Sequence, residues 1–123
     1  MTTSPNRPAV LVVDDLKDTA DSLATVLDMM GYDTRVAYSP RQVGELVRSG
    51  FRPDAAVLDI DLGEQSGFDV ARDLCAALGR RPMLVALTGY SSMEPRARRE
   101  GFDHYFLKPA EPRDVAGVLP AAS

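Results

Sequence analysis

Short apolar runs alternate along the chain with longer segments in which apolar residues recur every three or four positions. Three of the runs are apolar at every position: AVLVV, AAVL and MLVAL. A strand that is apolar throughout is typical of a parallel sheet covered on both faces. With two further β-rich segments, we predict five strands, at 9–13, 34–38, 55–58, 83–88 and 105–107.

The segments between these runs have the apolar spacing of amphipathic helices. Ser39-Pro40 is a typical helix start, Gly79 a typical helix end, and Pro120 stops the last helical segment. We predict five helices, at about 20–30, 40–47, 70–78, 93–100 and 112–119.

Strict alternation of strands and helices predicts an α/β fold with a parallel sheet. Right-handed crossovers then place helices on both faces, which gives a doubly wound three-layer sandwich. In such a sheet the ligand site lies beyond the carboxyl ends of the strands.

Polar residues stand at that edge of the predicted sheet. Four of the five strands end in a polar or charged side chain or are followed by one. The strand at 34–38 brings no such side chain to this edge, which fits an edge strand that lies away from the site. The residues are Asp14-Asp15, Asp59, Thr88 and Lys108. Taken singly, each has a structural explanation as a helix cap, a loop cap or a turn residue.

Taken together, these residues indicate chemistry. Three carboxylates in one place repel one another unless a cation neutralises them, and an oxygen-rich site of this kind suits Mg²⁺. A carboxylate such as Asp59 is also a workable nucleophile for a phosphoryl group, whose oxygens need metal, lysine and hydroxyl partners. Lys108 and Thr88 supply the last two. The combination predicts phosphoryl transfer to Asp59.

The chain of 123 residues is long enough for one compact domain. We assign residues 9–119 to this domain, 1–8 to a flexible N-terminus and 120–123 to a tail. Cys75 is the single cysteine, which excludes an internal disulfide, and no apolar run has the length of a membrane span. We expect a cytoplasmic protein without membrane contact.

The charge distribution argues against nucleic acid as a direct partner. The formal net charge is −4, whereas binding to phosphates requires a basic surface. Two arginine clusters are expected to be solvated surface, at 80–81 and 96–99.

Four motifs in order, VLVVDD, AVLDIDLGEQSGFDVA, LVALTGY and GFDHYFLKP, cover nearly the whole chain. With them the chain resembles bacterial response-regulator receiver domains of two-component signalling. The resemblance implies a flavodoxin-like sandwich of five helices around a sheet with strand order 2-1-3-4-5. It also implies a signalling module, which is no enzyme beyond assisting its own phosphorylation and slow self-dephosphorylation.

The resemblance also assigns roles at the site. Asp59 is similar to the phosphoacceptor, and Lys108 to the family's lysine, with a cis peptide bond before Pro109. Thr88 and Tyr105 are similar to the switch residues, which reposition on phosphorylation and repack the surface formed by the fourth helix, the fifth strand and the fifth helix. The implied Mg²⁺ ligands are Asp14 (largely through water), Asp15, Asp59 and the backbone carbonyl of Asp61.

The implied partners are a histidine kinase or a histidine phosphotransfer protein and a downstream protein, with a homodimer on phosphorylation as one further arrangement. The family's loop proline is replaced by Gly63, which leaves the rigidity of that loop open. By the same resemblance, Asp61 and Tyr90 stand at positions that tune self-dephosphorylation in the family, so the lifetime of the phosphoryl group stays open. The chain is either a stand-alone receiver or the receiver part of a hybrid kinase.

Two alternatives stand beside this interpretation. Asp59-Ile60-Asp61 is an Asp-x-Asp motif at a strand end, as in haloacid-dehalogenase-like phosphatases, in which the second aspartate is a general acid. Its mid-chain position and the absence of a cap domain argue against that class. A receiver-like binding module that is never phosphorylated is the second alternative, and the intact set of site residues argues against it.

Overall fold

The computed structural model describes residues 7–62 and 65–122, and within these ranges five strands alternate with helical segments. In chain order they are β1 (Ala9–Val13), α1 (Lys17–Met29), β2 (Asp33–Ala37), α2 (Pro40–Arg48), β3 (Ala55–Asp59), α3 (Gly67–Leu78), β4 (Met83–Thr88), the 3₁₀ turn η1 (Ser91–Met93), α4 (Glu94–Arg99), β5 (His104–Leu107) and α5 (Pro112–Ala116). The predicted alternation is confirmed. Most of the predicted flexible segment 1–8 lies outside the described residues, and so does Gly63.

The five strands form one sheet in the order β2-β1-β3-β4-β5, and every neighbouring pair is parallel. β2 is therefore an edge strand, as its lack of a site residue predicted. All five positions of β3, the central strand, are buried, because helices cover both faces of the sheet.

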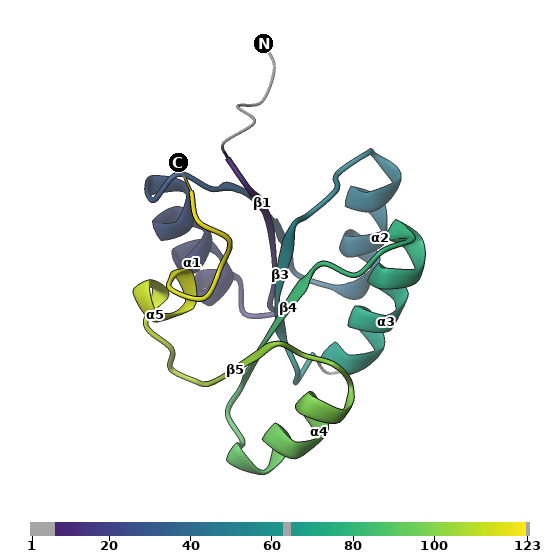
Figure 1. Ribbon diagram of the computed structural model, residues 1–123, viewed down its shortest axis with the longest axis vertical. Helices are drawn as coiled ribbons and strands as arrows, with labels where there is room; N and C mark the ends of the chain where they lie inside the picture. The colour runs from purple at the N-terminus through teal and green to yellow at the C-terminus, as the bar shows by residue number, and fades with distance from the viewer. Residues whose placement is uncertain (1–6, 63–64, 123) are drawn as a thin grey trace.

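The helices lie in two layers, one on each face of the sheet (Figure 1). α1 and α5 cover one face, where their apolar residues pack with Val10, Val12 and Val57 of the sheet. α2, α3 and α4 cover the other face, and there Phe68 and Phe102 meet edge to face with ring centroids 5.7 Å apart. The predicted three-layer sandwich is confirmed.

Side chains at the helix ends explain where several helices begin and stop. Ser39 and Ser66 each accept a hydrogen bond from the backbone N–H three residues on, which caps α2 and α3. Gly79 ends α3 in the left-handed conformation, with φ of 69°.

The last helix is shorter than the sequence predicts. α5 ends at Ala116 rather than at residue 119, and the N–H groups of Val118 and Leu119 bond to carbonyls three residues back. Pro120 has no N–H with which to continue the helix, so the chain leaves it through these tight turns. Leu119 still reaches the core and is 7% exposed.

Among the described residues no helix is long and apolar enough to cross a membrane.

Candidate functional site

The register of the sheet brings the predicted site residues to one edge. Val13 pairs with Leu58, so Asp14 lies next to the end of β3, where Asp59 is the last residue. Thr88 ends β4 and pairs with Leu107, which places Lys108 one residue beyond it. Residues that are far apart in the sequence therefore meet at the carboxyl end of the sheet, as the fold class predicted.

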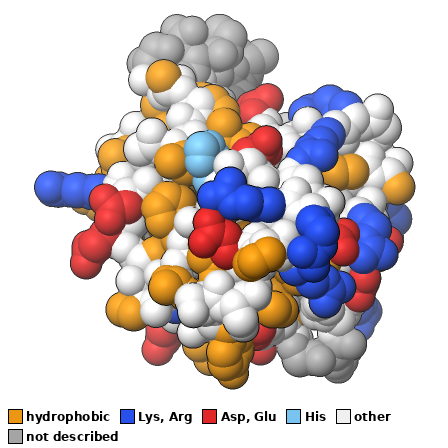
Figure 2. All heavy atoms as spheres, turned by 60° about the horizontal axis from the view of Figure 1, so that its bottom comes forward, with side chains coloured by type: hydrophobic (Ala, Val, Ile, Leu, Met, Phe, Trp, Pro, Cys, Tyr) orange, Lys and Arg blue, Asp and Glu red, His pale blue; other side chains and the backbone are white. Residues whose placement is uncertain are grey.

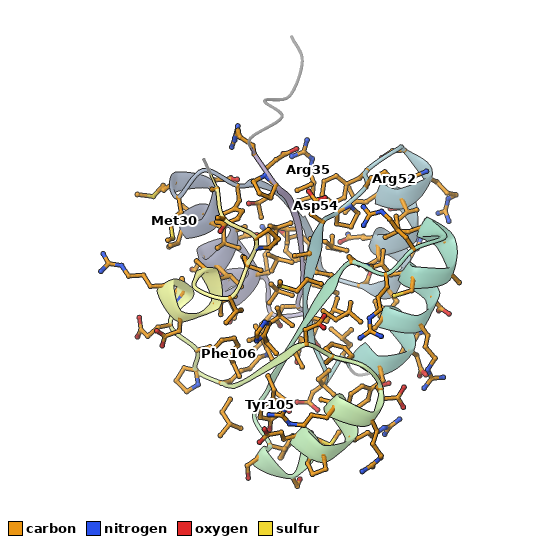
Figure 3. The ribbon with its side chains drawn as sticks, viewed as in Figure 1. Met30, Arg35, Arg52, Asp54, Tyr105 and Phe106 are labelled. Carbon is orange, nitrogen blue, oxygen red and sulfur yellow. The ribbon has the colours of Figure 1, made fainter. Side chains whose placement is uncertain are left out.

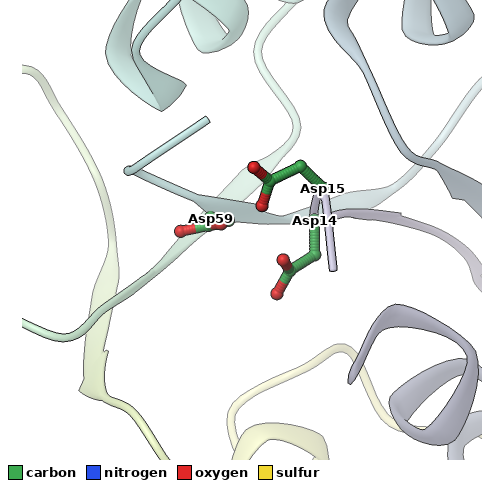
Figure 4. A group of neighbouring side chains, drawn as sticks. All are labelled: Asp14, Asp15 and Asp59. Carbon is green, nitrogen blue, oxygen red and sulfur yellow. The ribbon is translucent and has the colours of Figure 1, made fainter. Parts of the chain in front are cut away.

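Three carboxylates gather there, those of Asp14, Asp15 and Asp59. One oxygen from each lies within 4.8 Å of the others (Figure 4). Asp14 and Asp59 are each 1% exposed, whereas Asp15 faces solvent. The cluster is thus buried on one side and open to water on the other.

Backbone donors fix one oxygen of each buried carboxylate. Asp14 Oδ1 accepts a hydrogen bond of 3.0 Å from the N–H of Leu16, and Asp59 Oδ1 accepts one of 3.0 Å from the N–H of Asp61. α1 begins after Leu16 with no side-chain cap, so the alternative role of Asp14 or Asp15 as its N-cap is wrong. The remaining oxygen of each buried carboxylate points at other charged groups.

Lys108 is the cation that these remaining oxygens meet. Its Nζ lies 3.1 Å from Asp14 Oδ2 and 3.2 Å from Asp59 Oδ2. Burial by itself would lower the pKa of Lys108, but its interactions with the carboxylates of Asp14 and Asp59 outweigh it, and the net pKa is raised. The Lys108–Pro109 peptide bond is cis, as predicted. Lys108 is thus a fixed positive charge between two carboxylates.

Asp59 has a pKa of about 7, well above that of an ordinary aspartate. Burial is the main cause, and the neighbouring charge of Asp14 adds to it. The backbone N–H of Asp61 and the ammonium of Lys108 act in the opposite direction. A further positive charge at the cluster would favour ionised Asp59.

The donor set fits such a cation. Asp14 Oδ2 is buried and accepts no hydrogen bond of regular geometry, so it has capacity for a ligand beside Lys108. Carboxylate oxygens are the ligands that hard divalent cations prefer, and exposed Asp15 leaves room for water on the open side. The triad of Asp14, Asp15 and Asp59 is able to bind a divalent metal ion.

Thr88 is fully buried, and its hydroxyl is hydrogen-bonded to Asp61. Thr88 Oγ1 donates a hydrogen bond of 3.0 Å to Asp61 Oδ2 and accepts one of 3.2 Å from the N–H of Tyr90. The sequence predicted that Thr88 reaches this edge, but not that the Asp61 side chain holds its hydroxyl. The Asp-x-Asp spacing of Asp59 and Asp61 was the only signal for that contact.

Tyr105 lies on the α4 side of β5, while Phe106 points to the opposite face (Figure 3). The Tyr105 hydroxyl donates a hydrogen bond of 2.6 Å to the carbonyl oxygen of Tyr90. Its ring is half-buried, packed against the core formed with α2, α3 and α4. The predicted switch aromatic is therefore joined to the loop that follows Thr88.

One polar group at the same end of the molecule was not predicted from the sequence. The Tyr38 hydroxyl, directly after β2, donates to Asp21, and Lys17 donates to the Tyr38 hydroxyl at 3.3 Å. β2 thus does deliver a polar group, although it contacts α1 rather than the acidic cluster. A tyrosine at the end of a strand is usually interpreted as a packing residue, so nothing in the sequence pattern pointed to this contact.

Basic and acidic side chains alternate on the surface near this end (Figure 2). The predicted solvated arginines of α4 are exposed and form ion pairs, Arg98 with Glu94 at 2.7 Å and Arg96 with Glu100 at 3.7 Å. Such exposed pairs contribute little to stability, about 0–1 kcal/mol each.

Comparisons with known proteins agree with this geometry. The response regulator receiver domain family matches residues 10–119. Response regulator MprA of Mycolicibacterium vanbaalenii is 36% identical over 102 residues, which are 81% of this chain and 43% of that protein. This chain therefore spans less than half the length of that relative.

Solved structures share the fold. A CheY-like receiver domain protein from Methanospirillum hungatei is 26% identical, with a TM-score of 0.78 over 90% of this chain and 89% of that one. A response regulator from Burkholderia pseudomallei is 27% identical, with a TM-score of 0.76 over 92% of this chain and 66% of that one. The latter structure holds a phosphorylated aspartic acid, a calcium ion and citrate.

Proposed function

Because this chain belongs to the response regulator receiver domains, which are signalling modules rather than enzymes, we propose that it accepts a phosphoryl group on Asp59. The donor is a histidine kinase or a histidine phosphotransfer protein. The observation that carries the proposal is the position of Asp59, whose Oδ2 lies 3.2 Å from Lys108 Nζ inside a cluster of three carboxylates. The phosphatase alternative loses its support, because the family is not one of enzymes.

The chemistry follows from the contacts of Asp59. A carboxylate oxygen of Asp59 attacks the phosphorus of the donor as the phosphorus–nitrogen bond of phosphohistidine breaks, and the imidazole leaves with the electron pair. Lys108 and the Asp61 N–H lower the pKa of Asp59, so they increase the ionised fraction that can attack. Lys108 is also placed to neutralise charge on the transferred phosphoryl oxygens.

Mg²⁺ is the proposed cofactor. The side chains of Asp14, Asp15 and Asp59 and the backbone carbonyl of Asp61 would hold it. When bound, it neutralises the carboxylates and the phosphoryl oxygens. Asp14 would contribute a buried carboxylate to this site and Asp15 an exposed one.

Thr88 and Tyr105 are the proposed switch residues. A phosphoryl group on Asp59 attracts the Thr88 hydroxyl, and the Tyr105 ring moves inward as the loop at Tyr90 follows. The two hydrogen bonds that join these residues through Tyr90 support this role. The result is a population shift that changes the surface formed by α4, β5 and α5.

Incubation with acetyl phosphate and Mg²⁺, followed by intact mass, tests the proposal. We expect one phosphoryl adduct, which is lost in Asp59→Asn and in EDTA and is kept in Asp28→Asn, an exposed aspartate on α1. An adduct that survives Asp59→Asn would overturn the assignment. Sustained turnover of a phosphate ester, abolished in Asp61→Ala, would instead favour the phosphatase class.

A further inference from the structure

The hydroxyl of Thr88 is engaged by a residue other than the proposed phosphoacceptor. It donates to Asp61 Oδ2 at 3.0 Å, and a hydroxyl has one proton, so it cannot donate to a second acceptor at the same time. Thr88 is fully buried, whereas Asp61 is exposed, so the hydrogen bond ties a core residue to a surface carboxylate. Any group on Asp59 that takes the Thr88 proton must first replace Asp61.

Asp61 contacts both sides of this competition. Its backbone N–H donates to Asp59 Oδ1 at 3.0 Å, and its carboxylate accepts from Thr88. One residue therefore connects the proposed phosphoacceptor to the hydroxyl that responds to it. A change at Asp59 therefore acts directly on Asp61 through this backbone hydrogen bond.

Two further hydrogen bonds connect Thr88 to Tyr105 through the backbone of Tyr90. The N–H of Tyr90 donates to Thr88 Oγ1 at 3.2 Å, and the carbonyl of Tyr90 accepts from the Tyr105 hydroxyl at 2.6 Å. Ala86 on β4 pairs with Tyr105 on β5, so the two strands that carry Thr88 and Tyr105 are adjacent. With Thr88 held by Asp61, the loop at Tyr90 has a fixed partner for each of its two backbone groups.

We propose that the Asp61 carboxylate competes with the phosphoryl group on Asp59 for the Thr88 hydroxyl, and so holds Tyr90 and Tyr105 in the unphosphorylated arrangement. This inference rests on the proposed function. Asp61 is a positioning residue, because it acts through Thr88. It sets how far phosphorylation shifts the surface near α4 and β5.

The proposal ranks the substitutions at Asp61. Asp61→Ala removes the acceptor of the Thr88 hydrogen bond. It should raise about fivefold the population in which Tyr90 and Tyr105 have left the unphosphorylated arrangement, as expected for loss of one side-chain hydrogen bond. Asp61→Asn retains a carbonyl oxygen that can accept from Thr88, so its effect should be clearly smaller. If Asp61 acted only through its charge, the two variants would behave alike.

Nuclear magnetic resonance of the full chain, unphosphorylated and in EDTA, measures this directly through the Tyr90 amide and the Tyr105 ring. We expect both signals to move in Asp61→Ala, less in Asp61→Asn, and not in Asp28→Asn, a control for the loss of an exposed acidic side chain on α1. In a Thr88→Val background, Asp61→Ala should cause no further change. Equal shifts with and without the Thr88 hydroxyl, or equal shifts in Ala and Asn, would overturn the proposal.

The same variants, treated with acetyl phosphate and Mg²⁺, separate this inference from the proposed function. If no adduct forms on wild-type Asp59, the proposed function fails, while the unphosphorylated spectra still report whether Asp61 holds Thr88. If the adduct forms and Asp61→Ala leaves Tyr105 unmoved in both states, the proposed function stands and the inference fails. Should Thr88→Val not fold, the ranking of Ala against Asn at exposed Asp61 decides alone.

Discussion

Gly67, the first residue of α3, packs directly on the carbonyl oxygen of Asp59. A methyl group built on Gly67 would overlap that oxygen and would lie 2.9 Å from the Cα of Ile60. The N–H of Gly67 also donates to the carbonyl of Ile60 at 3.0 Å. The start of α3 and the end of β3 are therefore in backbone contact, and this contact positions Asp59.

Gly67→Ala should destabilise the fold and disturb the site. The atoms in the way are backbone, so α3 must move, at a cost on the order of 1–3 kcal/mol. Urea unfolding and the rate of phosphorylation by acetyl phosphate should both decline. Gly44→Ala is the matched control: in the interior of α2 its methyl meets only the flexible end of Arg48, so stability should rise by about 0.5–1 kcal/mol. Unchanged stability in Gly67→Ala would contradict the packing argument.

Lys108→Met should lower stability at pH 8 in metal-free buffer, because it leaves Asp14 and Asp59 buried without their cation. We expect a loss of roughly 2 kcal/mol by chemical denaturation. Loss of Lys108 also raises the pKa of Asp59 further, so lower pH should recover part of the stability. In an Asp59→Asn background the effect of Lys108→Met should be smaller; full additivity of the two substitutions would argue against the ion pair.

Asp59→Asn should stabilise the metal-free protein at pH 8. The folded state holds a proton on Asp59 up to about pH 7, whereas an unfolded aspartate loses it near pH 4. Wild-type stability therefore falls as pH rises from about 4 to about 7 and is level above that range. The gain from Asp59→Asn should grow over the same window to roughly 2–4 kcal/mol. Denaturation curves across pH check this, and Asp28→Asn should show no comparable gain.

Mg²⁺ should bind more weakly as Asp59 becomes protonated. Since the metal requires the ionised carboxylate and the pKa of Asp59 is about 7 without metal, affinity should fall about tenfold between pH 8 and pH 6. Calorimetry in buffers of different ionisation enthalpy should detect the proton released on binding near neutral pH. In Asp59→Asn the affinity should be weaker and nearly independent of pH. A wild-type affinity that stays constant over this range would contradict the raised pKa.

The hydrophobic pattern alone predicted the strands and the edge of the sheet at which the site lies. β3 is apolar up to Asp59 because a central parallel strand is buried on both faces, and a carboxylate directly after such a run can lie only at the sheet edge. The same reasoning placed Thr88 and Lys108 there, and both positions are confirmed. The strand order came from the family resemblance, since alternation does not specify which strands are neighbours.

Only the tertiary structure decided how these side chains pair. Asp14 and Asp15 are adjacent in the sequence, yet one is buried beside Lys108 and the other faces solvent. Thr88 binds Asp61, which is 27 residues away, rather than Asp59. Residue spacing determines which side chains reach the edge of the sheet, because strand and helix periods are regular. Rotamers and hydrogen-bond partners depend on distances between remote segments, which exist only once the chain has folded.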